Sequence, residues 1–260
     1  KTRRRVEAVL QKYNYTPSSI ARGLASSSMR MVGMVMQDIR NTHYIDMAYV
    51  IEQELRKKGF CCLFCNTDDP DPSNAFQMLR DFRVDGIILI GSVFMNEATE
   101  RAIDCYHPST KIVFVNGVLE RENVCSIQCD DRYGIEITVE HLIGRGHSGI
   151  LYIDDMDTDS ARRKREGYCT AMGRHFPGYG EEHMVRAPVM GFAGGYEAMK
   201  ALLEREEAFT AVVCSEDVVA LGAIRALEER ELRIPQDVAV AGFNNAWVGK
   251  LRRHELTSAD

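Results

Sequence analysis

Polar and aromatic side chains gather directly after the apolar segments of this 260-residue chain. Asp, Asn, His, Tyr and Trp in such positions are suited to binding a small polar ligand. Single polar residues are common at the ends of strands, so it is their clustering that indicates a site. The segments concerned are Gln37–Tyr44, Asn66–Asp69, Gly91–Ser92, Asn116–Gly117, Asp154–Ser160, Ala187–Phe192, Ser215–Asp217 and Asn244–Trp247.

Catalytic and metal chemistry find less support in the residue pattern. Histidines are present at positions 43, 141, 147 and 175, but no nucleophile elbow, P-loop or HExxH motif accompanies them. Cys61, Cys62 and Cys65 share one apolar run, in which alternation along a strand would split them between two faces. We therefore expect free thiols in a reducing cytoplasm, no metal site, no cofactor and no enzyme activity.

The strands and helices that would position these side chains alternate regularly from residue 32 onward. Short apolar runs alternate with helical stretches, which predicts an α/β fold with parallel sheets covered on both faces. The predicted strands are 32–36, 61–65, 86–90, 112–115, 124–129, 149–153, 184–187, 211–214 and 238–243, and the predicted helices are 43–58, 72–82, 95–105, 131–145, 160–175, 193–206 and 217–231.

Two lobes are favoured over one nine-stranded sheet. The segment Gly144–His147 follows a helix and is interpreted as the crossover between them. We expect an arm and linker over 1–30, a first lobe over 31–145 to which 257–260 return, and a second lobe over 146–256. Ligands of such folds bind at the carboxyl ends of the strands, which places the site in the cleft between the lobes.

The N-terminal arm is basic, whereas the rest of the chain is acidic. Residues 1–30 hold seven Lys or Arg and one acid, a net charge of +6, and the remaining 230 residues hold 25 bases and 37 acids, a net charge of −12. This asymmetry indicates that the arm meets a polyanion. The absence of a long apolar run argues against a membrane span, and no signal peptide is recognisable.

Two short helices are predicted in this arm. Val6, Val9, Leu10 and Tyr13 recur at helical spacing, which predicts a helix over 2–13. A second helix begins at Pro17 after the N-cap Thr16 and ends near residue 24; it is too short to be stable alone. DNA phosphates meeting Arg22 and a minor-groove contact of Leu24 would order it.

Taken together, these motifs closely resemble the lac-repressor (LacI/GalR) family of bacterial transcription regulators. The resemblance covers essentially the whole chain, and it rests on the order and spacing of motifs that are individually weak. They are Thr2–Val6, Tyr15–Pro17, Ala21–Leu24, Val32–Gly33, Asp38–Asn41 with Tyr44, Val84–Ile88, Gly146–His147, Gly167–Tyr168, Asp217–Gly222, Ile234–Pro235 with 238–243, and Leu256–Ser258.

The resemblance implies a type I periplasmic-binding-protein-like core with an N-terminal helical DNA-binding remnant. It implies a cytoplasmic homodimeric repressor whose binding to operator DNA is controlled by an effector, and this effector is a sugar or sugar derivative. It also implies that the recognition helix precedes residue 1, so that the chain is a fragment lacking the first headpiece helices and the C-terminal tail. The implied DNA-binding residues are Ser18, Ala21, Arg22 and Leu24, and the implied effector-binding residues are Asp38, His43, Tyr44, Ser92, Ser160, Lys164, Phe192, Glu216, Asn244 and Trp247.

The chain departs from the family's pattern in three places. Lys164 stands where the family usually has Arg, Glu216 where it has Asn, and Asn244–Asn245 where it has two Asp. Lys lacks the bidentate fork of Arg. Lys164 and Glu216 either pair with each other or recognise a ligand that carries charges of its own. The alternative function for the two-lobed core is a periplasmic-type solute-binding protein for uptake.

Overall fold

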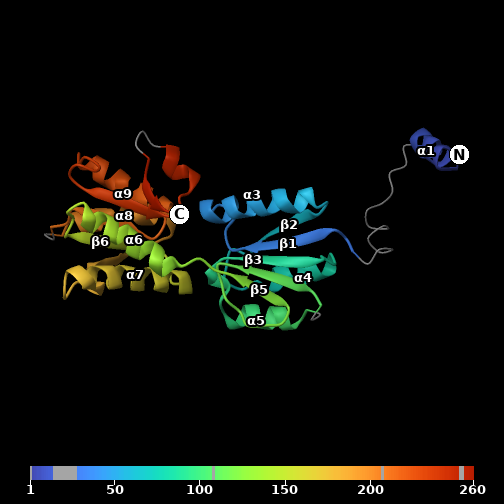
Figure 1. The fold of residues 1–260 in the computed structure, drawn as a ribbon, viewed down its shortest axis with the longest axis horizontal. Coiled ribbons are helices and arrows are strands. Elements are labelled where there is room, and N and C mark those ends of the chain that lie inside the picture. Colours follow the sequence, from blue (N-terminus) through green and yellow to red (C-terminus); the bar gives the residue numbers. More distant parts are fainter. Residues whose placement is uncertain (1, 14–27, 107–108, 206–207, 252–254) are drawn as a thin grey trace.

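The protein folds into two α/β lobes (Figure 1). The computed structural model describes residues 2–13, 28–106, 109–205, 208–251 and 255–260. The first predicted helix is confirmed as α1, Thr2–Lys12. The predicted second helix of the arm, from Pro17 to near residue 24, is called the hinge segment below. This segment and its candidate DNA-binding residues, Ser18, Ala21, Arg22 and Leu24, lie outside the described residues.

The first lobe is a five-stranded parallel sheet with the strand order β2-β1-β3-β4-β5. Buried Tyr44 and Ala48 of α3 pack against one face of this sheet, and apolar side chains of α4 and α5 pack against the other. The elements are β1 Met31–Met36, α3 Thr42–Lys57, β2 Cys61–Asn66, α4 Ser73–Asp81, β3 Gly86–Ile90, η1 Ser92–Phe94, α5 Glu97–Asp104, β4 Lys111–Val115 and β5 Val124–Ile127.

The second lobe repeats this plan, with the strand order β10-β9-β8-β6-β7. Helices α6 and α7 cover one face of the sheet, and α8 and α9 cover the other. The elements are α6 Asp131–Gly144, β6 Ile150–Asp154, α7 Asp159–His175, η2 Glu181–His183, β7 Met184–Arg186, α8 Gly191–Leu203, β8 Ala211–Cys214, α9 Asp217–Glu229, β9 Ala239–Phe243, η3 Trp247–Leu251 and β10 Thr257–Ala259. The predicted two-sheet fold is thus confirmed.

Two of the expected boundaries need correction. Helix α6 packs against α7 and the second sheet, because its apolar residues Ile135, Val139 and Leu142 share a core with Tyr152 and Tyr168. The chain therefore passes between the lobes just before α6, and the segment Gly144–His147 is not the crossover. In addition, residues 257–259 do not return to the first lobe: they form β10, which pairs with β9 in the second sheet.

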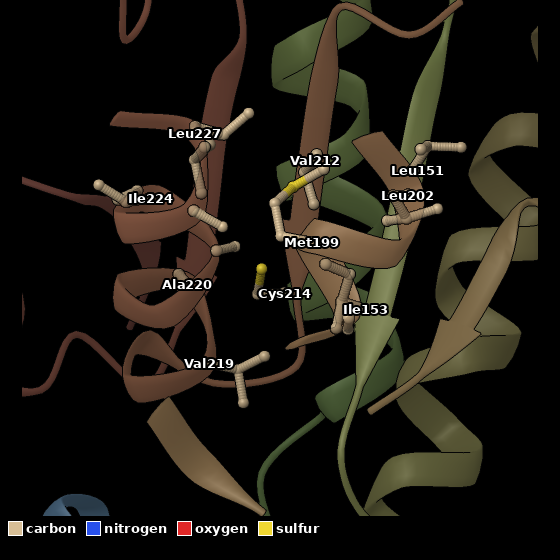
Figure 2. Close-up of a cluster of buried hydrophobic side chains, with 14 of the residues drawn as sticks. Leu151, Ile153, Met199, Leu202, Val212, Cys214, Val219, Ala220, Ile224 and Leu227 are labelled. Atoms are coloured by element: carbon tan, nitrogen blue, oxygen red, sulfur yellow. The ribbon is translucent and has the colours of Figure 1, made fainter. Parts of the chain in front are cut away.

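The core of the second lobe explains why its central strands β6, β8 and β9 are mostly apolar. In Figure 2, Leu151 and Ile153 of β6 and Val212 and Cys214 of β8 lie among side chains of α8 and α9, including Met199. The alternate residues of the same strands, such as Tyr152 and Val213, face α6 and α7. A strand that is buried on both faces carries apolar residues at most positions. It therefore lacks the alternation of apolar and polar residues that is typical of half-exposed strands.

The cysteines of β2 point to opposite faces, as the alternation along the strand predicts. Cys65 belongs to the core beneath α4, whereas Cys62 packs on the side of α3. Cys62 and Cys65 are spaced as a C-x-x-C pair, but an extended strand separates such a pair. All eight cysteines are free, and no group of three or more potential metal ligands occurs among the described residues.

Side-chain caps fix where the helices begin. Asn41 caps α3 by accepting hydrogen bonds from the backbone N–H groups of His43 and Tyr44. Thr158 caps α7 by accepting one from Ala161. These caps hold the first turn of each helix at the end of the preceding strand.

Within the described part of the chain, no helix has the length and apolar character needed to span a membrane.

Helices α8 and α9 touch at Gly222, which yields a test of the core. A Cβ atom at Gly222 would overlap the backbone carbonyl of Phe192 in α8. Replacing Gly222 with Ala should therefore lower the free energy of unfolding by about 1–3 kcal/mol, since the two helices must separate. Urea denaturation measures this change.

The matched control is Gly173→Ala in α7, where a Cβ atom meets no other atom within 4 Å. That exchange should raise the free energy of unfolding by about 0.5–1 kcal/mol through helix propensity. Equal effects of the two substitutions would contradict close packing of α8 on α9.

Candidate functional site

Strand-end loops of both lobes line one small cavity between the lobes. The first lobe contributes the start of α3, the first residue of η1 and the residue that follows β4. The second lobe contributes the loops after β6, β8 and β9 together with α7. The lining residues are His43, Tyr44, Ser92, Asn116, Asp155, Met156, Thr158, Ser160, Ala161, Lys164, Ser215, Glu216 and Asn244. The parallel sheets therefore bring together side chains that are as far apart in sequence as His43 and Asn244.

A wider cavity adjoins this one. The inner cavity has a volume of about 20 Å³, which is room for about one water molecule. The outer cavity has a volume of about 500 Å³, and it shares Tyr44, Asp155, Met156 and Glu216 with the inner one. The two together form a cleft that is narrow at its base and wide at its mouth.

One side-chain hydrogen bond crosses the cleft within the described residues. The Asn41 Nδ2 atom donates to a carboxylate oxygen of Glu216 over 3.4 Å. The Oδ1 atom of the same amide caps α3, so both ends of the Asn41 side chain are engaged. Asn41 thus ties the start of α3 in the first lobe to the start of α9 in the second.

The aromatic residues at the start of α3 are held in their neutral forms. Burial, assisted by the positive charge of Lys164, lowers the pKa of His43 to about 4. Burial also raises the pKa of Tyr44 above its ordinary value, and the nearby carboxylates of Glu216, Asp155 and Asp131 act in the same direction. At neutral pH these two side chains therefore present uncharged hydrogen-bonding groups to the cavity.

Lys164 is a buried cation on the first turns of α7. Its side chain is enclosed, and the residue is only 6% exposed. The Nζ atom donates a hydrogen bond of 2.9 Å to the carbonyl oxygen of Ser215 and lies 4.1 Å from the centre of the Phe243 ring. Among the described residues, no carboxylate oxygen lies within 4.0 Å of this ammonium group, so a direct pair with Glu216, one of the two alternatives considered from the sequence, is not formed.

Glu216 sits at the start of α9, facing the first lobe. Burial raises the pKa of its carboxyl group to about 7, and Lys164 opposes this increase only in part. At neutral pH the side chain is therefore divided between its protonated and ionised forms. It can donate a hydrogen bond in one form and accept in both.

Other carboxylates around the cleft are committed to fixing the loops. Asp154 bonds Arg165 at 2.6 Å, and Asp131 bonds Arg163 at 2.6 Å. Asp217 accepts a bond of 2.6 Å from the backbone N–H of Ala246, which anchors the loop after β9 to α9. These pairs hold the backbone at the edge of the cavity while other residues face the space inside.

The structure separates the expected effector-binding residues into three groups. His43, Tyr44, Ser92, Ser160, Lys164, Glu216 and Asn244 line the inner cavity. Asp38 lines the outer cavity, where it forms an ion pair with Arg40. Phe192 and Trp247 line neither of these two cavities and are about half exposed (47% and 50%).

Several cavity residues were not singled out in the sequence. Asn116, Asp155 and Ser215 belong to strand-end segments that were recognised, but nothing in their spacing showed which side chains turn inward. Asn116 has a φ of 59°, a left-handed conformation that Asn tolerates better than most residues. Asn41 carried a usable signal, because it stands immediately before a predicted helix, where Asn is a preferred cap.

The comparisons with known proteins agree on one family. A family model described as periplasmic binding proteins and sugar binding domain of LacI family matches residues 29–260. An HTH-type transcriptional regulator from Lachnoclostridium phytofermentans is 30% identical over 264 residues, covering 100% of this chain and 79% of that protein. The ribose operon repressor of Escherichia coli K12 is 28% identical over 257 residues, covering 98% of this chain and 77% of that protein.

A solved structure supports the same assignment. A sugar-binding transcriptional regulator of the LacI family from Escherichia coli, crystallised in complex with phosphate, superimposes with a TM-score of 0.72. It is 26% identical, and the match covers 89% of this chain and 84% of that chain.

Burial of neutral His43 should make the fold less stable in acid. The ordinary pKa of histidine, about 6.5, applies to the unfolded chain, so between that value and about 4 the unfolded state binds more protons. This residue therefore lowers the free energy of unfolding as the pH falls through that range. In His43→Gln, the loss of stability between pH 7 and pH 5 should be smaller by about 1–2 kcal/mol, measured by urea denaturation.

His141→Gln is the matched control, since it removes an exposed histidine of α6. An unchanged pH dependence in His43→Gln would show that His43 is not held neutral by burial.

Proposed function

Because the chain belongs to the LacI family, we propose that it is a DNA-binding transcriptional repressor that senses a small polar metabolite between its lobes. The observation that carries this proposal is the cavity at the base of the cleft, to which the strand ends of both lobes contribute. The inner cavity holds about one water molecule, so a ligand binds there with the lobes further apart than in this structure. Such a ligand touches both lobes at once, and its binding energy therefore depends on how they are oriented. The alternative of a solute-binding protein for uptake gains no support from the relatives, which are named as regulators and repressors.

A sugar or sugar derivative is the proposed class of effector. The cavity offers hydroxyl, amide, imidazole and carboxyl groups from Ser92, Ser160, Asn116, His43 and Glu216, which match the alternating donors and acceptors of a polyol. One relative is named a ribose operon repressor, and a sugar-binding regulator shares the fold.

The proposed mechanism couples the cleft to the N-terminal arm. The effector favours one orientation of the lobes over the other, and in a cytoplasmic homodimer this changes the spacing of the two hinge segments on DNA. Only the difference in affinity between the two orientations shifts the equilibrium. The coupling is reciprocal, so operator DNA must change the affinity for the effector by the same factor as the effector changes the affinity for DNA.

The bond between Asn41 and Glu216 offers a test of lobe closure. Asn41→Asp keeps a side chain that caps α3 but places a second carboxylate against Glu216. The repulsion should weaken binding of the sugar that gives the largest thermal shift by about tenfold at pH 8, and by less at pH 6, where Glu216 is mostly protonated. Isothermal titration calorimetry at both pH values measures this difference.

Asn41→Ser is the control, because Ser also caps a helix and adds no charge. Equal losses of affinity in the two variants at both pH values would exclude electrostatic closure across the cleft.

DNA binding is tested with the full-length gene product and the palindromic sequences upstream of its own gene. Arg22→Ala should weaken binding and reduce its dependence on salt, since fewer counterions are released; Leu24→Ala should weaken it without that change of slope. Fluorescence anisotropy across a salt series, with and without the sugar, gives both quantities.

Lys200→Ala, on α8 in the second lobe, serves as the matched loss of a positive charge. Absence of binding in both conditions, or binding that does not respond to salt, would refute the role of a DNA-binding regulator.

A further inference from the structure

The charge of Lys164 has no dedicated counter-ion among the residues that the structure describes. Its ammonium group donates to the carbonyl of Ser215 and lies over the ring of Phe243, which are both neutral partners. Buried charges in proteins are normally paired. A cation enclosed at the wall of a cavity, with donor capacity left after one hydrogen bond, is a feature that a bound anion would complete.

The carboxylates nearby are occupied by other donors. Asp131 and Asp159 bond Arg163, and Asp154 bonds Arg165. Asp155 accepts from the hydroxyl of Ser215 at 3.1 Å and from the backbone N–H of Gly191 at 2.8 Å. These groups are fixed in the loops, so they are not available to move onto Lys164.

Asp217 is held by the backbone N–H of Ala246 at 2.6 Å, which leaves Glu216 as the candidate that faces the cavity. Glu216 compensates Lys164 incompletely. Its described hydrogen bond is the long contact of 3.4 Å with Asn41. With a pKa near 7, it carries only part of a negative charge at neutral pH. Protonated Glu216 can also stand beside an anion, to which it donates a hydrogen bond.

The opposite wall of the cavity provides groups for hydroxyls. The Oδ1 atom of Asn116 is buried and has no hydrogen-bond partner within the described part of the chain. An acceptor left in this state is costly unless a ligand or water donates to it. The hydroxyl groups of Ser92 and Ser160 line the same space, and Ser160 lies in the first turn of α7, whose positive end favours an anion.

We propose that the effector is a polyhydroxylated acid whose carboxylate or phosphate group binds Lys164 while its hydroxyl groups bond Asn116 and the serines of the cavity. This inference rests on the proposed function and narrows its ligand class. A neutral sugar would leave the ammonium of Lys164 without a counter-ion, whereas an amine would place a second cation beside it.

The same geometry links ligand binding to a proton. An anion beside Glu216 favours its protonated form, so the complex holds more protons than the free protein above pH 7. Affinity for the acid should therefore fall as the pH rises from 7 to 9. The charged or titratable groups that face Glu216 are Lys164 of α7, Asp155 after β6, Asp217 of α9, and His43 and Tyr44 of α3.

Matched probes separate the possibilities by isothermal titration calorimetry. The set is D-gluconate, glucose 6-phosphate, D-glucose and D-glucosamine, with D-ribonate, ribose 5-phosphate and D-ribose as a second series. In at least one series an acid should bind about tenfold or more tightly than its neutral sugar. Comparing the carboxylate with the phosphate member identifies which anion is recognised.

Three variants test the assignment to Lys164. Lys164→Met should weaken binding of the acid by about 30-fold and leave a neutral sugar within about threefold, whereas Lys164→Arg should keep the preference for the acid. The control Lys111→Met removes an exposed charge at the start of β4 and should change neither. Thermal unfolding of each variant verifies that it is folded.

Glu216→Gln tests the link to a proton: in this variant the fall in affinity for the acid above pH 7 should disappear.

Several outcomes would overturn the inference. It is wrong if the neutral sugar or the amine binds as tightly as the acid, if no acid binds at about 10 mM, or if Lys164→Met binds the acid normally. Neutral sugars that bind in the cleft while the acids do not would leave the proposed function intact. Failure of every sugar and acid to bind would count against the cleft as the sensor as well.

Discussion

Parallel strand pairing is the constraint on which the rest of this structure depends. Because every strand of a sheet runs the same way, the loops that follow the strands all emerge at one edge, and the helices begin there too. Two such edges face each other across the cleft. Helix starts, with their unpaired N–H groups and partial positive charge, therefore surround the cavity from both lobes. The capping side chains of Asn41 and Thr158 accept hydrogen bonds from these N–H groups, and acidic residues such as Asp217 place negative charge near the positive helix ends.

Charge is distributed around the cavity in two layers. Arginines and carboxylates such as Arg163 with Asp131 form close pairs that fix the loops. Inside them, Lys164 and Glu216 remain near each other without direct contact and are less fully satisfied. A charged group without a close partner in the folded chain can form new interactions with a bound ligand. A paired group mainly keeps the backbone in place.

Sequence reasoning located the strands and helices well, because fully buried strands and capped helices leave strong local signals. It failed at the lobe boundary. The apolar stripe of α6 shows that the helix covers a sheet, but not which of two sheets, and only the shared core with Tyr152 settles this. The short strand β10 was also missed, since three residues carry little periodicity. In the site, strand ends were identified correctly, yet which side chains turn inward depends on loop backbone such as the left-handed Asn116. Phe192 and Trp247 belong to strand-end segments as well, yet they line neither of the two cavities.

The two roles of the Asn41 side chain restrict which residues could replace it. Its side-chain oxygen begins α3 while its side-chain nitrogen reaches Glu216. Ser, Thr and Asp supply an acceptor without that donor, and Gln carries both groups on a longer stem that ordinarily does not cap a helix. One amide thus serves local folding and contact between lobes together. A substitution of Asn41 would therefore change the start of α3 and the contact between the lobes at the same time. Substitutions that change the response to the effector without disturbing the fold are expected at other positions, where different atoms stabilise the helix and contact the opposite lobe.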